Sequence, residues 1–511
     1  MQEEGLPSAS HWTWSYRNLT WLLAIVGIAI RVQQYLHNRS LWLDEALIAL
    51  NLLHRSFHQL TEQLDFHNVA PPAWLFIEKA SSVMFGKSEL ALRLPVLLSG
   101  VLAMLLLPFL GKRLLSDRAL CIAVGLFAFS RPLIYYSSEL KPYGSDVAVA
   151  VATWLLGFWT LQRPSLARIA VLALWGGIAT WLSHPALFVV AGLGFTLICS
   201  LAISRDWCSL ASFVPVFLVW MASFAANFWL FLRPGTHDPV LLNNYPALRL
   251  SLWHVEDIER PFETIFALQQ NPITIFLGVL VFVFCVGCLH YWRANRVAFS
   301  FLFSPLLFAL AASSLHRYPM VGRFYLFYTP VLVILAAAGA EQVLVASATS
   351  RLHVGAVLLA LLFVQPMLSM REIVAHPIEA TELRPVLQFV QQHQHPGDVW
   401  YVYCFTRFAF QYYAEVYGLT SPNVVVGRCP SRAQRQVFQQ DASMLCGKQV
   451  WTIIADPWAI GGANDLDLVL QAFSAAGTQR QSYSRVGAVA YLYEMSPPPG
   501  QPDRPAATQL H

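Results

Sequence analysis

Long apolar stretches dominate the chain and recur at short intervals between residues 19 and 370. A membrane-spanning helix needs roughly 20 predominantly apolar residues. Stretches of this kind cover 19–37, 90–111, 119–136, 143–162, 168–184, 186–203, 210–231, 272–290, 297–315, 324–345 and 353–370. The pattern therefore predicts a mainly α-helical, polytopic membrane protein with about eleven transmembrane helices.

The loop between the first two predicted spans, residues 38–89, contains two further apolar runs. The runs cover 46–57 and 73–85, and each is too short to cross a bilayer. Pro72 and Gly86 flank the second run and fit the beginning and the end of a helix. We expect both runs to form helices in the outer interface of the membrane, and a re-entrant pair of helices is the alternative.

Composition agrees with a membrane protein. Hydrophobic residues make up 56% of the 511 residues and charged residues only 12%, whereas soluble domains carry roughly 25% charged residues. The net charge of +4 is small for this length and gives no reason to expect a nucleic-acid partner. Residues 1–16 lack a basic cluster and a small-residue cleavage pattern, so we expect the first apolar segment to be a retained span.

Basic residues in the short loops predict the orientation of the chain. With the N-terminus inside, every inner loop carries at least one Lys or Arg. These residues are Lys112, Arg113, Arg118, Arg163, Arg168, Arg205, Arg293, Arg296 and Arg351. An odd number of spans then places the chain after Arg371 outside. Polar, ionisable and aromatic residues gather in the outer loops, among them 233–271 and 316–325, which indicates chemistry or binding at the outer face.

The composition changes after the last span, which suggests three parts: a membrane domain over 1–375, an outer α/β domain over 376–495, and a Pro-rich disordered tail over 496–511. Residues 379–394 predict a helix with one apolar face, formed by Leu383, Val386, Leu387 and Val390. Strand-like runs at 400–404, 423–426, 450–455 and 488–493 alternate with helix-like runs at 405–417, 431–444 and 465–475. Such alternation is typical of an α/β domain. Cys429 and Cys446 are candidates for a disulfide, which the sequence leaves open.

The stretch S-L-W-L-D-E-A, residues 40–46, follows the first span and contains the adjacent carboxylates Asp44 and Glu45. Charges at membrane depth are costly unless they reach water or serve a function, and Asp and Glu are too short to reach far. We expect this pair at the membrane–water boundary, facing a cavity. The alternative is that Asp44 is the N-cap of a helix beginning near Ala46.

Five motifs between Leu41 and Pro330 resemble those of a known superfamily. They are L-W-L-D-E-A, N-V-A-P-P-A-W-L-F, S-E-L-A-L-R-L-P, S-S-E-L-K-P-Y and G-R-F-Y-L-F-Y-T-P, in this order. The sequence resembles the integral-membrane glycosyltransferases of the GT-C fold. The nearest groups are the protein O-mannosyltransferases, the lipid A aminoarabinose transferases and their bacterial relatives with an RgtA/B/C/D-like domain. The resemblance covers the membrane domain.

The resemblance implies transfer of a sugar from a polyprenyl-phosphate donor to a lipid, glycan or protein acceptor, outside a bacterial inner membrane. Inverting displacement of the phosphate needs a carboxylate base for the acceptor hydroxyl. Asp44 matches that base, and Glu45 is the adjacent candidate. Glu139 matches a second acidic residue, which orients the acceptor, holds a metal or shapes the pocket; alternatively it pairs with Lys141 at a wet surface.

The candidates for donor phosphate binding are Lys141 and Arg323, since Arg grips phosphate with two hydrogen bonds and Lys acts as a point charge. Alternatively, Arg323 reaches toward lipid headgroups. Substrate-binding candidates are Tyr143, His184 and His67, although Tyr143 also suits the aromatic belt of the interface. A divalent metal held by acidic residues and His is possible, but no ligand spacing requires one and no other cofactor is indicated.

Two other functions remain open. A transporter or flippase of polyprenyl-linked glycans would carry ionisable residues at mid-span and repeated halves; Arg31 is one of few such residues, and no halves repeat. A glycan polymerase or ligase would use a diphosphate donor. The glycosyltransferase function requires Asp44 to lie near Glu139 and Arg323. The sugar, the acceptor, the metal dependence and the oligomeric state are not specified by the sequence.

Overall fold

The computed structural model describes residues 10–233, 274–315, 317–320, 322–347, 353–429, 436–457, 459–460 and 463–497. The chain divides into two compact units. A membrane unit consists of Met1–His37, Arg55–Gly86 and Leu90–Ile378, and a second unit consists of Asn38–His54, Lys87–Glu89 and Glu379–His511. Outside the described residues lie nearly all of the predicted outer loop 233–271, His316, Arg351, part of the predicted helix 431–444 and most of the tail 496–511.

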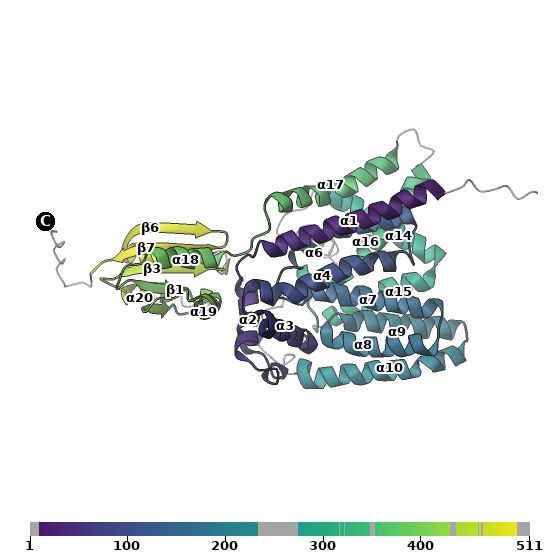
Figure 1. Ribbon diagram of the computed structural model, residues 1–511, viewed down its shortest axis with the longest axis horizontal. Coiled ribbons are helices and arrows are strands. Elements are labelled where there is room, and N and C mark those ends of the chain that lie inside the picture. The colour runs from purple at the N-terminus through teal and green to yellow at the C-terminus, as the bar shows by residue number, and fades with distance from the viewer. Residues whose placement is uncertain are drawn as a thin grey trace, which may run out of the picture. The chain divides into compact units, whose positions relative to one another are not determined.

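The membrane unit is a bundle of helices (Figure 1). Its elements are α1 (Ser10–Leu36), η1 (Gln59–Thr61), η2 (Asp65–His67), α3 (Pro72–Phe85), α4 (Glu89–Gly111), α5 (Asp117–Ala128), α6 (Arg131–Tyr135), α7 (Tyr143–Gln162), α8 (Leu166–Leu182), α9 (Ala186–Ile203), α10 (Trp207–Asn227), η3 (Phe228–Leu232), α14 (Thr274–Ala294), α15 (Arg296–Ser314), η4 (Gly322–Tyr328), α16 (Thr329–Ser347) and α17 (Val354–Ala375). The long apolar helices run roughly alongside one another in Figure 1.

Nine helices among the described residues are long and apolar enough to cross a membrane, and they match nine of the eleven predicted spans. The chain is an integral membrane protein. The span predicted over 168–184 corresponds to α8, which has 17 residues. The span predicted over 119–136 is not one helix, because α5 ends at Ala128 and α6 starts at Arg131. Pro132 explains the break, since its ring clashes with the carbonyl four residues earlier in a continuous helix.

Two glycines let α14 and α16 approach closely. A Cβ atom on Gly287 would lie 1.9 Å from the carbonyl oxygen of Leu335, and one on Gly339 would lie 1.8 Å from that of Val283. Both distances are shorter than any real contact. Small residues at such crossings allow backbones to meet in the membrane, where packing replaces the hydrophobic effect as the force between helices.

Arg31, the ionisable residue in the middle of the first span, has a structural role. Its guanidinium is buried and donates hydrogen bonds to the carbonyl oxygens of Gly27, Phe127 and Ala128 at 2.9, 3.1 and 3.1 Å. The last carbonyls of a helix lack intrahelical donors, so Arg31 completes the end of α5. A mid-span charge used in this way offers no support for a transport path.

The first outer loop forms two helices, as predicted. Helix α3 starts at Pro72 and stops before Gly86, whose φ of 96° suits glycine. Helix α2 (Leu43–His54) starts earlier than expected, at Leu43. Asp44 therefore lies within the first turn of α2, and the alternative that it is the N-cap is wrong. Helix α2 belongs to the second unit.

The second unit contains the predicted α/β domain. Its elements after residue 379 are α18 (Leu383–His393), β1 (Val399–Val402), α19 (Thr406–Tyr417), β2 (Val424–Val426), α20 (Val437–Ser443), β3 (Gln449–Ala455), β4 (Ala459–Ile460), β5 (Ala463–Asn464), α21 (Asp465–Ala476), β6 (Gly477–Arg485) and β7 (Ala488–Met495). The main sheet has the order β2-β1-β3-β7-β6. Strand β1 is parallel to β2 and β3, while β7 is antiparallel to β3 and β6.

Helices cover both faces of this sheet. The four predicted apolar residues of α18 are all buried, and Phe389 of this helix meets Trp451 of β3 with ring centroids 6.1 Å apart. On the other face, Phe473 of α21 meets Tyr401 of β1 at 4.8 Å. Strand β6 escaped prediction because its residues are mostly polar and exposed. It is an edge strand, which pairs with β7 alone.

The candidate disulfide between Cys429 and Cys446, which the sequence left open, is not formed. Cys429 is bonded to Cys404, and Cys446 is a free cysteine. Cys404 follows β1 and Cys429 follows β2, and these strands are adjacent and parallel. Their carboxyl ends lie at the same edge of the sheet, which puts the two Cα atoms 5.2 Å apart, within the range of disulfides.

Candidate functional site

The turn before α7 holds two of the predicted site residues. Glu139 is fully buried and Lys141 is nearly so. The backbone N–H of Lys141 donates to the carbonyl oxygen of Glu139 at 2.6 Å, so the turn is tight. Because both side chains are buried, the alternative of a wet surface pair does not hold. A buried Lys and a buried Glu are costly unless they serve a structure or a ligand.

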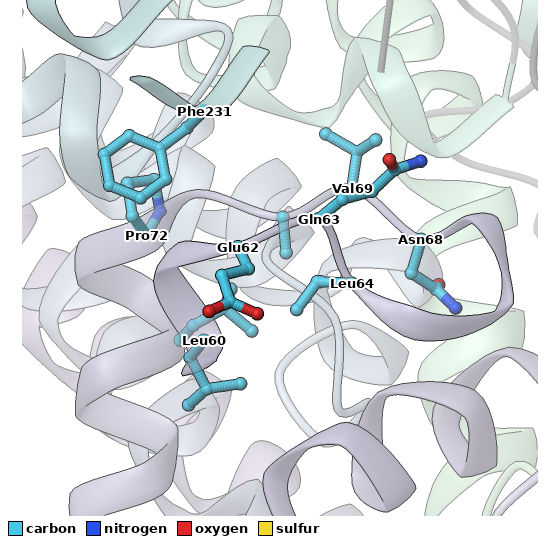
Figure 2. Close-up of a pocket in the computed structure, with 10 residues that line it drawn as sticks. Leu60, Glu62, Gln63, Leu64, Asn68, Val69, Pro72 and Phe231 are labelled. Carbon is cyan, nitrogen blue, oxygen red and sulfur yellow. The ribbon is translucent and has the colours of Figure 1, made fainter. Parts of the chain in front are cut away.

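Lys141 also connects this turn to the first outer loop. Its Nζ atom lies 3.5 Å from Oδ1 of Asn68, the first residue of the motif N-V-A-P-P. Asn68 lines a small pocket (Figure 2), together with apolar side chains that include Leu64 and Pro72 and with Phe231 of η3. Residues from two distant segments thus form a recess, and most of the residues that line it are apolar.

Arg323 lies beside the start of α7. Its guanidinium carbon lies 5.1 Å from the ring centroid of Tyr143, and Tyr143 is buried. The ring of Tyr143 also meets Tyr136 at 5.5 Å and Phe324 at 5.6 Å. A cation over an aromatic face is held by the negative face of the ring. Arg323 therefore contacts Tyr143, which follows Lys141 by two residues.

Asp146 is a further acidic residue at this site. It lies one turn after Tyr143 on α7 and is buried, and the hydroxyl of Ser183 is hydrogen-bonded to it. Asp146 is close enough to Tyr318 to act on it electrostatically, and the ring of Phe324 meets those of both Tyr143 and Tyr318. The spacing of three residues between Tyr143 and Asp146 puts both on one face of a helix, which is the signal that could have identified Asp146.

His184 lies in the turn between α8 and α9, directly after Ser183. Its Nε2 atom is buried and has no hydrogen-bond partner among the described residues. Burial lowers the pKa of His184 from 6.5 to about 4, so the imidazole is neutral at physiological pH. His67 is exposed, in η2, with a φ of 55°.

The acidic pair of α2 lies in the second unit, and its two members differ. Glu45 is fully buried and forms an ion pair with Arg39 at 2.6 Å. Asp44 is only partly buried. Because a buried carboxylate locked to a guanidinium is a weak proton acceptor, Asp44 is the better placed of the two to act as a base.

Three side chains from the C-terminal part of the chain hold the backbone before Asp44. Glu382 accepts hydrogen bonds from the backbone N–H and the hydroxyl of Ser40, each at 3.0 Å. The hydroxyl of Tyr413 accepts from the N–H of Leu41 at 2.7 Å. The carboxylate of Asp456 accepts from the N–H of Leu43 at 2.8 Å. No pattern in the sequence indicated Glu382, Tyr413 or Asp456, because more than 300 residues separate them from α2.

Glu89, the acidic residue of the motif S-E-L-A-L-R-L-P, also belongs to this unit. It is fully buried. Arg384 donates to it at 2.8 Å, and the hydroxyls of Tyr413 and Tyr417 donate to it as well. Three donors fully satisfy a buried carboxylate, so this motif residue has a structural role in the second unit.

Comparisons with known proteins agree with this architecture. The family model of dolichyl-phosphate-mannose-protein mannosyltransferase matches residues 69–229. The crystal structure of ArnT from Cupriavidus metallidurans in the apo state matches with a TM-score of 0.53 and 13% identity, covering 95% of this chain and 98% of that chain. ArnT bound to undecaprenyl phosphate matches with a TM-score of 0.52 and 14% identity over the same shares. The chain has no match among curated protein sequences.

This chain has the GT-C fold. The predicted resemblance to the GT-C membrane glycosyltransferases is therefore confirmed. The part that the family model matches includes Glu139, Lys141, Tyr143 and His184, and it excludes Asp44 and Arg323. The start of α7 is thus the part of the candidate site that the family model itself covers.

Metal ligands were a further possibility for this GT-C chain. Within the ranges that the structure describes, no group of three or more His, Cys, Asp or Glu side chains is arranged to hold a metal ion. Cys285 and Cys288 have C-x-x-C spacing, but they are free cysteines inside transmembrane helix α14.

Proposed function

We propose that this chain is an inverting glycosyltransferase that takes a sugar from a polyprenyl-phosphate donor. The observation that carries this proposal is the cluster at the start of α7, where Lys141 and Arg323 accompany the buried ring of Tyr143. Two cations beside an aromatic ring suit a phosphate joined to a sugar. The family model describes an enzyme that uses dolichyl-phosphate mannose, and ArnT, which shares the fold, was crystallised with undecaprenyl phosphate.

The proposed reaction is a single displacement at the anomeric carbon. The acceptor hydroxyl attacks this carbon, its proton passes to Asp44, and the bond from the carbon to the phosphate oxygen breaks. Polyprenyl phosphate leaves with the electron pair from the face opposite the attacking oxygen, so the configuration inverts. Lys141 and Arg323 stabilise the negative charge that grows on the phosphate. Glu139 orients the acceptor, Glu45 keeps Arg39 in place, and Tyr143, His184 and His67 contribute to substrate binding.

We further propose that the active site and the C-terminal domain lie on the outer side of a bacterial inner membrane. The disulfide between Cys404 and Cys429 supports this side, because disulfides form in oxidising compartments such as the periplasm. The acceptor would then be an extracytoplasmic lipid, glycan or protein.

The test uses the full chain purified in detergent and reconstituted into vesicles. Mass spectrometry of co-purifying lipids should detect a sugar-linked polyprenyl phosphate. Labelled dolichyl-phosphate mannose and undecaprenyl-phosphate sugars are then tested for sugar transfer to an envelope extract. Asp44→Asn should abolish transfer, whereas Asp467→Asn, at an exposed position of the C-terminal domain, should not.

Other outcomes would replace the proposal. Retained transfer by Asp44→Asn would exclude Asp44 as the base. Movement of the labelled lipid across the vesicle membrane without transfer would identify a flippase. Transfer from polyprenyl-diphosphate donors alone would identify a polymerase or ligase.

A further inference from the structure

Asp456 occupies an unusual position at the end of strand β3. Its φ is 50°, in the left-handed region that Asp and Asn tolerate better than most residues. Its backbone N–H donates to the carbonyl oxygen of Gly487 at 3.2 Å, so the neighbouring turn before β7 holds this conformation. Strain at this position indicates that the side chain of Asp456 is held toward specific partners.

The carboxylate of Asp456 bridges two segments that are distant in sequence. Its Oδ1 accepts a hydrogen bond from the hydroxyl of Thr381, and its Oδ2 accepts from the N–H of Leu43 at 2.8 Å, across a sequence separation of 413 residues. Leu43 is the first residue of α2. The first N–H groups of a helix lack partners within it, and the helix dipole favours a negative charge there. Asp456 therefore caps α2 from outside the helix.

The charges around Asp456 are mostly negative. Burial raises the pKa of Asp456, and the charges of Asp44 and Glu45 raise it further. The carboxylates of Asp44 and Asp456 are therefore close enough to repel each other when both are charged. Arg39 offsets the charge of Glu45 through the ion pair. Glu382 and Glu379, which precede α18, are two further carboxylates in this unit.

We propose that Asp456 is a positioning residue for the acidic pair: its carboxylate fixes the first turn of α2 and sets a further negative charge near Asp44. A neighbouring negative charge makes a carboxylate a stronger base. Stronger basicity is what a group needs when it must take a proton from a hydroxyl. The proposal deepens the function proposed above and depends on it for its catalytic meaning. In this proposal, the C-terminal domain supplies Asp456 to hold the acidic pair of α2 in position.

Other contacts keep this part of the chain folded when Asp456 is changed. Glu382 and Tyr413 still hold Ser40 and Leu41. Asp456→Asn retains one oxygen that can accept from Leu43, so the cap on α2 is kept. It removes the charge and replaces the acceptor of the Thr381 hydroxyl by an NH2 group. Asp456→Ala removes both the charge and the cap. The two variants therefore separate the electrostatic part of the proposal from the structural part.

The test measures Asp44 directly in the full-length protein in detergent. A carbodiimide modifies the protonated carboxyl, so the extent of labelling of Asp44 against pH, read by peptide mass spectrometry, gives its pKa. In Asp456→Asn this pKa should fall by about one pH unit, because a like charge has been removed. Asp441→Asn is the matched control, since Asp441 is also a buried carboxylate of this domain but pairs with Arg428; it should leave the profile unchanged.

Hydrogen exchange tests the capping role. In Asp456→Ala the amides of the first turn of α2 should exchange about fivefold faster, as expected for loss of an N-terminal cap. An unchanged Asp44 profile in Asp456→Asn, or unchanged exchange in Asp456→Ala, would overturn the corresponding part of the proposal. Neither readout needs a donor. Failure of Asp44 as the base would appear instead as sugar transfer by Asp44→Asn, which separates the two outcomes.

Discussion

The guanidinium of Arg323 lies over the ring of Tyr143, with its central carbon 5.1 Å from the ring centroid. This contact joins the motif S-S-E-L-K-P-Y to the motif G-R-F-Y-L-F-Y-T-P. Lys141 precedes Tyr143 by two residues and contacts Asn68, so a third motif, N-V-A-P-P, reaches the same place. Motifs that are far apart in the sequence therefore build one end of the membrane unit together.

Replacing Arg323 should weaken donor binding. Charge-assisted hydrogen bonds contribute about 1.5–3 kcal/mol each, so Arg323→Ala should raise the KM for the polyprenyl-phosphate donor about 10- to 100-fold. Arg323→Lys should recover part of this loss, because it keeps the charge but not the two parallel hydrogen bonds. Steady-state kinetics with Arg317→Ala, at a nearby exposed arginine, provides the control. Equal KM values for Arg323→Ala and Arg317→Ala would exclude a phosphate-binding role.

The buried carboxylate of Glu89 should be essential for the stability of the second unit. Glu89→Ala leaves Arg384, Tyr413 and Tyr417 without their common acceptor. Breaking a buried ion pair from one side costs about 3–5 kcal/mol. Thermal unfolding in detergent, followed by intrinsic fluorescence, should show a large decrease in Tm.

The comparison for this variant is Glu415→Ala. Glu415 forms an ion pair with His54 at 2.7 Å, but both side chains are well exposed. Exposed pairs contribute about 0–1 kcal/mol, so Tm should change little. Similar losses in the two variants would contradict the role given to Glu89.

Glu78 of α3 should make stability depend on pH. It is fully buried, and neither carboxylate oxygen has a hydrogen-bond partner among the described residues. Burial raises the pKa of Glu78 well above 4.5, so the folded protein keeps a proton that the unfolded chain releases. The free energy of unfolding should therefore fall as pH rises above 4.5, by about 1.4 kcal/mol per pH unit, until the folded pKa is passed.

Glu78→Gln should remove this pH dependence and raise Tm at neutral pH, because the amide has no proton to lose. Unfolding curves measured across this pH range test the expectation. Glu62→Gln, at an exposed position of the same loop, should leave the pH dependence in place. A wild-type pH profile for Glu78→Gln would show that the carboxyl is solvated or paired.

The disulfide can be tested by counting thiols. The unfolded, unreduced protein should react at six cysteines. Cys404→Ser should add one thiol by freeing Cys429, and Cys446→Ser should remove one. The first variant should also lose about 2–4 kcal/mol of stability in the C-terminal domain, because a cross-link constrains the unfolded chain. A count that rises in Cys446→Ser would instead indicate a disulfide between Cys429 and Cys446.

Local patterns predicted much of this fold correctly. The lengths of the apolar stretches predicted nine membrane spans correctly. The spacing of apolar residues predicted the buried face of α18. Pro72 and Gly86 set the limits of α3. These features depend on residues a few positions apart, so the sequence records them directly. The prediction of one helix over 119–136 is wrong, because the stretch stays apolar while Pro132 interrupts the helical backbone.

Contacts between distant segments were decided only by the tertiary structure. The sequence determined that this is a membrane protein with an acidic pair after its first span and cations in two later motifs. Only packing could decide that Glu45 is locked to Arg39, that Cys404 is the partner of Cys429, and that Asp456 binds the first turn of α2. Hydrogen bonds, ion pairs and disulfides form wherever folding brings their atoms within a few ångströms, and no local periodicity encodes that distance.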